Sequence, residues 1–219
     1  MIFDTHAHYD DEAFDEDREE LLGSLRDHGI HYVVNVGASL QGARDSVRLS
    51  SCYSAVYAAV GIHPDEIGCL SDDVMEELIE LCRSEHTVAV GEIGLDYHYE
   101  DTDKEAQQYW FRKGLELAIL LKKPVCIHSR DADDDTMRIL KESGIFSQKR
   151  YDDFPPREDG SPEARVLLHS FSGSAELARQ YVKLGADISI SGPVTYKNAR
   201  KAVQVVAETE LSRLTAETD

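Results

Sequence analysis

The sequence is poor in basic residues. Lysine and arginine number 23 against 42 aspartates and glutamates, which gives a formal net charge of −19. Proteins that coat nucleic acid carry a basic face, and no long basic run is present here. The composition therefore argues against a general nucleic-acid binder. Any site for a polyanion would need bound divalent cations or local basic residues, for which the candidates are Arg130, Lys197, Arg200 and Lys201.

Cysteines are few, and long apolar runs are lacking. The four cysteines form no CxxC pair, and no stretch approaches the roughly 18 apolar residues of a membrane helix. The first residues lack the basic leader and long apolar region of a signal peptide, so we expect none. These features predict a cytoplasmic protein with no membrane association. The sequence also lacks a Walker-type phosphate loop and a GxSxG nucleophile motif.

What the sequence has is a repeated alternation of apolar strands with amphipathic helices. Such alternation is typical of parallel βαβ units. We predict an α/β TIM-type (β/α)8 barrel, as a single domain over residues 1–219. The predicted strands cover residues 2–6, 32–36, 56–62, 88–93, 124–128, 165–169, 187–191 and 213–217.

The helices are expected at 14–28, after an N-cap at Ser71, at 104–122 and around 177–184. Seven full helices accompany the eight strands, so the barrel is expected to lack its final helix and to leave outer faces of the first, seventh and last strands partly bare. Residues 145–164 are polar and rich in proline and glycine, and we interpret them as an inserted loop at the rim away from the chemistry.

Residue types that bind metals stand where apolar runs stop. His6 and His8 are two positions apart, so that both side chains point to one face of a strand. Glu92 ends the run that starts at Val88, and a carboxylate buried there needs a partner. A cation would supply that partner, and the two oxygens of one carboxylate can bridge two metals. Asp4, one step deeper on the first strand, could orient a ligand.

Two further strands end on histidine, at His128 and His169, and the last strand leads to Asp219. Asp219 suits a metal ligand, a general base for an attacking water, or both. His63 also follows a strand and could contact substrate. His98 is a weaker candidate, and the histidines at 28, 31 and 86 are expected at the opposite rim.

In order along the chain, seven short motifs closely resemble those of the TatD family of metal-dependent deoxyribonucleases. They are Asp4-Thr5-His6-Ala7-His8, Gly61-Ile62-His63-Pro64, Gly91-Glu92-Ile93-Gly94-Leu95-Asp96-Tyr97, Ile127-His128-Ser129-Arg130-Asp131-Ala132, His169-Ser170-Phe171-Ser172-Gly173, Ile190-Ser191-Gly192-Pro193 and Glu217-Thr218-Asp219. The resemblance runs from residue 2 to the last residue. It implies a TIM barrel with two divalent cations that hydrolyses phosphodiester bonds, typically 3′ to 5′ on DNA.

Carried over by position, the resemblance implies a role for each matching residue. His6, His8 and Asp219 would hold the first metal, Glu92 would bridge, and His128 with His169 would hold the second. His63 and Arg130 match positions suited to a substrate phosphate. Family members usually continue past Glu217-Thr218-Asp219 into a final helix, which this sequence does not show.

The expected activity is metal-dependent hydrolysis of ester bonds, with Glu92 or Asp219 as proton acceptor and DNA, as single-stranded ends, as the partner of a monomeric enzyme. The identity of the metals stays open, because nitrogen-rich ligation favours Zn²⁺ or Mn²⁺ whereas the family resemblance points to Mg²⁺. Two alternatives stand beside the deoxyribonuclease. One is an ester or amide hydrolase such as an aminoacyl-tRNA deacylase, and the other is a truncated, inactive barrel.

Overall fold

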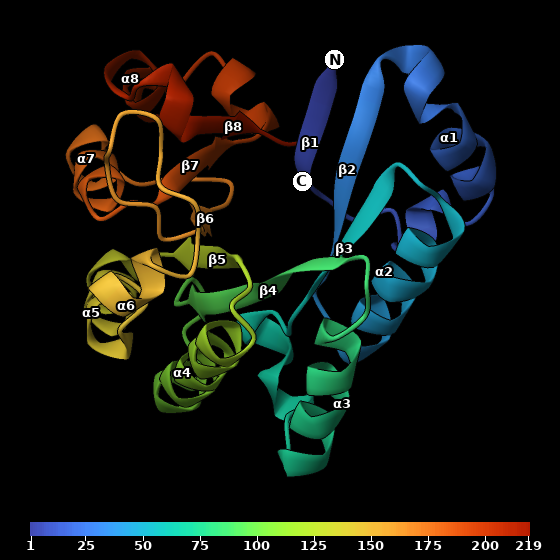
Figure 1. The fold of residues 1–219 in the computed structure, drawn as a ribbon, viewed down its shortest axis with the longest axis horizontal. Coiled ribbons are helices and arrows are strands. Elements are labelled where there is room, and N and C mark those ends of the chain that lie inside the picture. Colours follow the sequence, from blue (N-terminus) through green and yellow to red (C-terminus); the bar gives the residue numbers. More distant parts are fainter.

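The computed structural model describes residues 1–219 and forms a nearly closed barrel of eight parallel strands (Figure 1). Each strand pairs with the next along the chain, and helices lie between them on the outside. This confirms the predicted TIM-type barrel. The strands are β1 (Ile2–Ala7), β2 (Ile30–Gly37), β3 (Val56–Val60), β4 (Thr87–Asp96), β5 (Val125–Arg130), β6 (Val166–Leu168), β7 (Asp187–Ile190) and β8 (Leu214–Ala216).

Every predicted helix is present, but one is divided. The α-helices are α1 (Arg18–Ser24), α2 (Leu40–Cys52), α3 (Asp72–Cys82), α4 (Lys104–Leu120), α5 (Asp133–Ser143), α6 (Gln148–Tyr151), α7 (Ala175–Lys183) and α8 (Arg200–Glu208). The continuous helix predicted over 14–28 is wrong, because α1 ends at Ser24 and a 3₁₀ turn, η2 (Leu25–His28), follows. The Ser24 hydroxyl donates to the carbonyl of Leu21, a side-chain bond that competes with the helical ladder.

The seam between β8 and β1 is bridged by residues from β1 and from the last residues of the chain, and Figure 1 shows the C-terminus beside the end of β1. Thr218 donates its backbone N–H and its hydroxyl to the carboxylate of Asp4, and the Asp219 N–H donates to the carbonyl of His6. Ile2 and Phe3, at the start of β1, are 55% and 50% exposed, so the amino end of the first strand is open to solvent. The seam places Asp219 beside β1.

A single cluster of 29 buried hydrophobic residues packs the barrel against the surrounding helices. A smaller cluster of seven, including Leu22, Val33 and Leu49, packs α1 and α2 against β1 to β3. Burial of this apolar surface fixes the strands relative to one another. The side chains at the strand ends are therefore held on a rigid scaffold.

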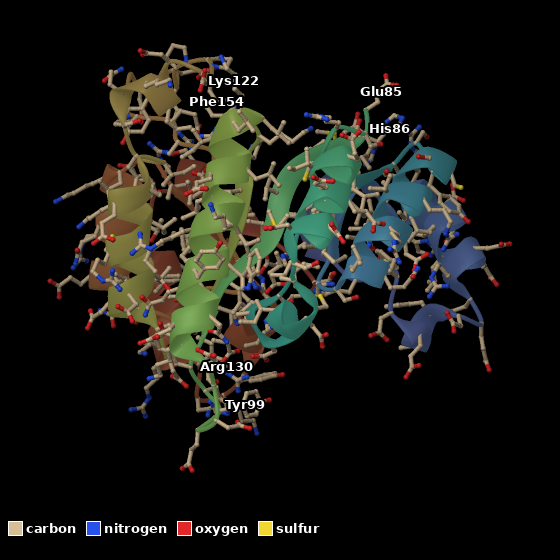
Figure 2. All side chains as sticks on the ribbon, turned by 90° about the horizontal axis from the view of Figure 1, so that it is seen from below. Glu85, His86, Tyr99, Lys122, Arg130 and Phe154 are labelled. Atoms are coloured by element: carbon tan, nitrogen blue, oxygen red, sulfur yellow. The ribbon has the colours of Figure 1, made fainter.

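Residues 145–164 connect α5 to β6 and contain helix α6, so this segment is not a continuous loop. Arg150 of α6 is buried and donates to the backbone carbonyls of Ala118, Lys123 and Ala164. Figure 2 shows Phe154 of this segment at the end of the molecule opposite Arg130. The segment thus lies away from the carboxyl ends of the strands. None of the helices combines the length and apolar character needed to cross a membrane.

Candidate metal centre

The predicted site residues meet at the carboxyl ends of the strands, around a cavity of about 420 Å³. Of the predicted site residues, only His6 does not line the cavity, and its side chain is fully buried on β1. The residues that line the cavity include His8, His63, Glu92, His128, Arg130, His169 and Asp219. Sites in TIM barrels lie at this end, because the strands there open into their βα loops.

Glu92 enters the cavity because β4 carries a bulge. Val90 pairs with Val125 and Ile93 with Ile127, so two residues of β4, Gly91 and Glu92, stand opposite a single residue of β5. The strand predicted over residues 88–93 is too short, since β4 continues to Asp96. Glycines permit the close approach of the two strands: a Cβ added at Gly94 would lie 1.9 Å from the carbonyl oxygen of His128.

The carboxylate of Glu92 lies between two pairs of imidazoles. Its Oε1 is 2.7 Å from Nδ1 of His128 and 2.7 Å from Nε2 of His169. Its Oε2 is 3.5 Å from Nε2 of His6 and 4.0 Å from Nε2 of His8. One oxygen faces each pair, which is the arrangement that lets one carboxylate bridge two cations.

Asp219 lies on the side of His6 and His8. Its Oδ1 is 3.7 Å from Nε2 of His6, 3.8 Å from Nε2 of His8 and 3.9 Å from Nδ1 of His169. The Asp219 side chain is 29% exposed, against 4% for Glu92. Asp219 is thus the more open of the two carboxylates.

The imidazole nitrogens fit divalent cations. Nε2 of His6 lies 3.0 Å from Nε2 of His8, and Nδ1 of His128 lies 3.2 Å from Nε2 of His169. Within each pair, nitrogen faces nitrogen beside a carboxylate, and a cation can accept both lone pairs. The geometry brings together His6, His8 and Glu92 as one group of ligand atoms within 4.8 Å of one another, and His63, Glu92 and His128 as another. His63, expected to contact substrate, is therefore also a candidate ligand.

The other nitrogen of each imidazole contacts the protein. Such outer partners fix the tautomer and orientation of metal-binding histidines. The partners are the Val36 carbonyl for His8, Cys126 for His6, Asp96 for His128 and Glu217 for His169. Nδ1 of His169 is buried and makes no hydrogen bond, with a Glu217 oxygen 3.5 Å away.

Charges in the cluster are strongly coupled. Burial alone would raise the pKa of Glu92, but the adjacent His169, His128 and His6 outweigh it and hold that pKa well below its usual range. Burial would lower the pKa of His169, but Glu92 and Glu217 raise it to about 10. Burial and the neighbouring His169 lower the pKa of His6. Without metal the cluster therefore holds a proton on His169, which a cation would displace.

Sequence reasoning missed two buried carboxylates beside the cluster, Asp96 and Glu217. Asp96 accepts from Nε2 of His128 at 3.1 Å, and Glu217 accepts from the backbone N–H of Ser170. Asp4, expected to orient a ligand through a hydrogen bond, accepts from the backbone N–H groups of His6 and Thr218 and contacts no imidazole nitrogen. The only available signal for Asp96 and Glu217 was their place in the family motifs.

The remaining histidines lie outside the cavity lining. His98 is at the rim, where its Nδ1 lies 3.0 Å from Oδ2 of Asp131. In Figure 2, His86 lies at the opposite end of the molecule from Arg130, as expected.

Comparisons with known proteins agree with this geometry. The model of the family "TatD related DNase" matches residues 3–219. The chain belongs to the TatD family of metal-dependent hydrolases. This chain is 36% identical over 219 residues to the uncharacterized metal-dependent hydrolase YabD of Bacillus subtilis. The alignment covers all of this chain and 80% of YabD. It is 33% identical over 220 residues to the uncharacterized metal-dependent hydrolase YjjV of Escherichia coli, covering all of this chain and 78% of YjjV.

Solved structures show the same TatD barrel. The crystal structure of the TatD homologue YjjV from Escherichia coli superposes with a TM-score of 0.85 at 32% identity, over all of this chain and 78% of that one. A TatD-family hydrolase from Entamoeba histolytica superposes with a TM-score of 0.83 at 22% identity, over all of this chain and 73% of that one, and it supports the fold alone.

Proposed function

We propose that this TatD-family hydrolase is a deoxyribonuclease that uses two divalent cations to remove nucleotides from single-stranded DNA ends in the 3′ to 5′ direction. The observation that carries the proposal is the position of Glu92, with one oxygen toward His6 and His8 and the other toward His128 and His169. The match to the DNase family model supports the choice of DNA.

The residues divide into two groups that would hold the cations. His6, His8 and Asp219 would hold one, His128 and His169 the other, and Glu92 would bridge. When bound, the two cations would stabilise the charge that develops on the scissile phosphate and lower the pKa of the attacking water.

Asp219 is the better proton acceptor of the two carboxylates. Both Glu92 Oε1 contacts to imidazole nitrogen are 2.7 Å, and the side chain is buried, so its lone pairs are engaged. Asp219 is more exposed to the cavity, and the nearest imidazole nitrogens, those of His6 and His8, are 3.7 and 3.8 Å from its Oδ1. In this proposal the Asp219 carboxylate takes the proton of the attacking water.

Arg130 and His63 would hold the phosphate. Both line the cavity, and the Arg130 side chain is 46% exposed at its mouth. An arginine matches the geometry of phosphate oxygens, because its planar guanidinium can donate two parallel hydrogen bonds.

The experiment compares substrates in one buffer with Mg²⁺, Mn²⁺ or Zn²⁺. A 5′-labelled single-stranded oligonucleotide should be shortened stepwise from its 3′ end, and the Glu92→Gln variant should leave it intact. Turnover of an aminoacyl-tRNA or a simple acyl ester with no cleavage of DNA would instead establish the alternative, an ester or amide hydrolase. Endonucleolytic products from a circular single strand would contradict the exonuclease assignment.

A further inference from the structure

A solvent-exposed tyrosine stands beside the mouth of the cavity. Tyr99 lies in the loop between β4 and α4 and is 54% exposed. The guanidinium carbon of Arg130 lies 6.0 Å from the centre of its ring. Figure 2 shows the two side chains at the same end of the molecule. At this distance the cation is at the outer limit of a cation–π contact, which leaves much of the ring surface open.

The loop that carries Tyr99 is tied to the site. The N–H of Tyr97 donates to the carbonyl of Arg130, and the N–H of His98 donates to the buried carboxylate of Asp96. The His98 ring lies 5.2 Å from the Tyr99 ring in an edge-on arrangement. These contacts hold the tyrosine at a fixed place relative to His128, whose Nε2 binds the same Asp96 carboxylate.

Two basic side chains, Arg130 and Lys201, lie at or beside this mouth, and Nη1 of Arg130 is also 3.9 Å from Oδ2 of the buried Asp96. Arg130 and Ser172 both line the cavity, and Nζ of Lys201 donates to the carbonyl of Ser172. These two cations give the edge of the cavity groups that can pair with an anionic ligand. A flat ring with cations beside it is the combination with which proteins bind single-stranded nucleic acid, by base stacking and phosphate contacts.

We propose that Tyr99 and Arg130 form a nucleotide subsite. The base of a nucleotide next to the scissile bond stacks on the open face of Tyr99, and its phosphate pairs with Arg130. The inference rests on the proposed deoxyribonuclease function and adds a specificity: the substrate must present an unpaired base at the rim, as a single-stranded end does and a small ester does not.

The test compares three variants on two substrates. Tyr99→Ala removes the ring, and Tyr99→Phe keeps it. Tyr109→Ala is the matched control. Tyr109 is 52% exposed on α4 with Nζ of Lys113 5.8 Å from its ring centre, and Lys113, unlike Arg130, does not line the cavity. The substrates are a single-stranded oligothymidylate and the same strand with abasic residues at its last three 3′ positions, which keeps every phosphate.

For the intact strand, Tyr99→Ala should raise KM by about 5- to 150-fold, because stacking of a base on an aromatic ring contributes about 1–3 kcal/mol. For the abasic strand, KM should be the same in Tyr99→Ala and the wild type. Tyr99→Phe should restore the wild-type preference, and Tyr109→Ala should have wild-type KM on both strands. Circular dichroism melts of the variants should coincide, because Tyr99 is exposed.

The subsite is overturned if the wild type cleaves DNA but Tyr99→Ala has the same KM on the intact strand. It is equally overturned if Tyr99→Ala raises KM on intact and abasic strands alike. If the wild type itself leaves both strands uncut, the proposed function fails, and the subsite that rests on it fails with it.

Discussion

Asp96 is predicted to strengthen metal binding through His128. Its Oδ2 accepts from Nε2 of His128 at 3.1 Å, so that Nδ1 of the same ring is turned toward Glu92. Removal of such an outer partner weakens metal binding by about 10- to 100-fold. The Asp96→Asn variant should therefore bind metal with a dissociation constant raised about 10- to 100-fold, equivalent to about 1.4–2.7 kcal/mol.

The fold should tolerate this change. The carbonyl oxygen of asparagine can still accept from the backbone N–H of His98, which now donates to Oδ1 of Asp96. What asparagine lacks is the negative charge that favours an Nε2–H tautomer and raises the basicity of Nδ1 on His128. The melting temperature of the metal-free variant should therefore stay close to that of the wild type.

The assay is isothermal titration calorimetry of metal-free protein with Mn²⁺, paired with thermal melts in EDTA. Asp187→Asn is the control, because Asp187 begins β7 at the opposite rim and accepts from Arg157. The control should lower the melting temperature and leave Mn²⁺ affinity unchanged. Wild-type Mn²⁺ affinity in Asp96→Asn, or an equal loss in both variants, would refute the reasoning.

Three further predictions concern Glu92, His169 and Leu115. Loss of a residue that only supports a metal ligand reduces activity by up to about 100-fold. Glu92→Gln should reduce kcat on a labelled oligonucleotide by more than that, and a smaller loss would exclude Glu92 as the bridge between two cations. The pKa of His169 is raised to about 10 by Glu92 and Glu217 against the effect of burial, above about 6.5 in the unfolded chain. Protonated His169 therefore stabilises the metal-free protein fully below about pH 6.5, and this stabilisation is lost as pH rises through about 10. In urea unfolding with EDTA, the difference in free energy of unfolding between wild type and His169→Gln should shrink over that pH range. A difference that widens would contradict this. Leu115→Ala, at a fully buried position of α4, should lower the free energy of unfolding by about 2–5 kcal/mol and leave Mn²⁺ affinity unchanged in calorimetry.

The barrel and the convergence of its polar side chains could be predicted from the sequence. Apolar runs that stop on His128 and His169 mark the last part of a strand or the residue just after it, since β5 continues to Arg130 and β6 ends at Leu168. Parallel strands bring their carboxyl ends to one rim. His6, Glu92 and Asp219 followed from the same rule. The structure places all of these around one cavity or directly behind it.

The local path of β4 could not be predicted. The bulge at Gly91 and Glu92 extends the strand to Asp96, whereas a pattern of apolar residues ends it near Ile93. Asp96 therefore resembled a loop residue in the sequence, although it is buried against His128. The division of the first helix could not be predicted either, because the spacing of apolar residues gives no information on the hydrogen bond from the Ser24 hydroxyl to the Leu21 carbonyl.

The central claim is that Glu92 joins two cation positions, and anomalous diffraction from crystals soaked in Mn²⁺ tests it most directly. We predict two peaks about 3.5–4 Å apart, one beside His6, His8 and Asp219 and the other beside His128 and His169, with the Glu92 carboxylate between them. A single peak, or peaks outside this cluster, would contradict it.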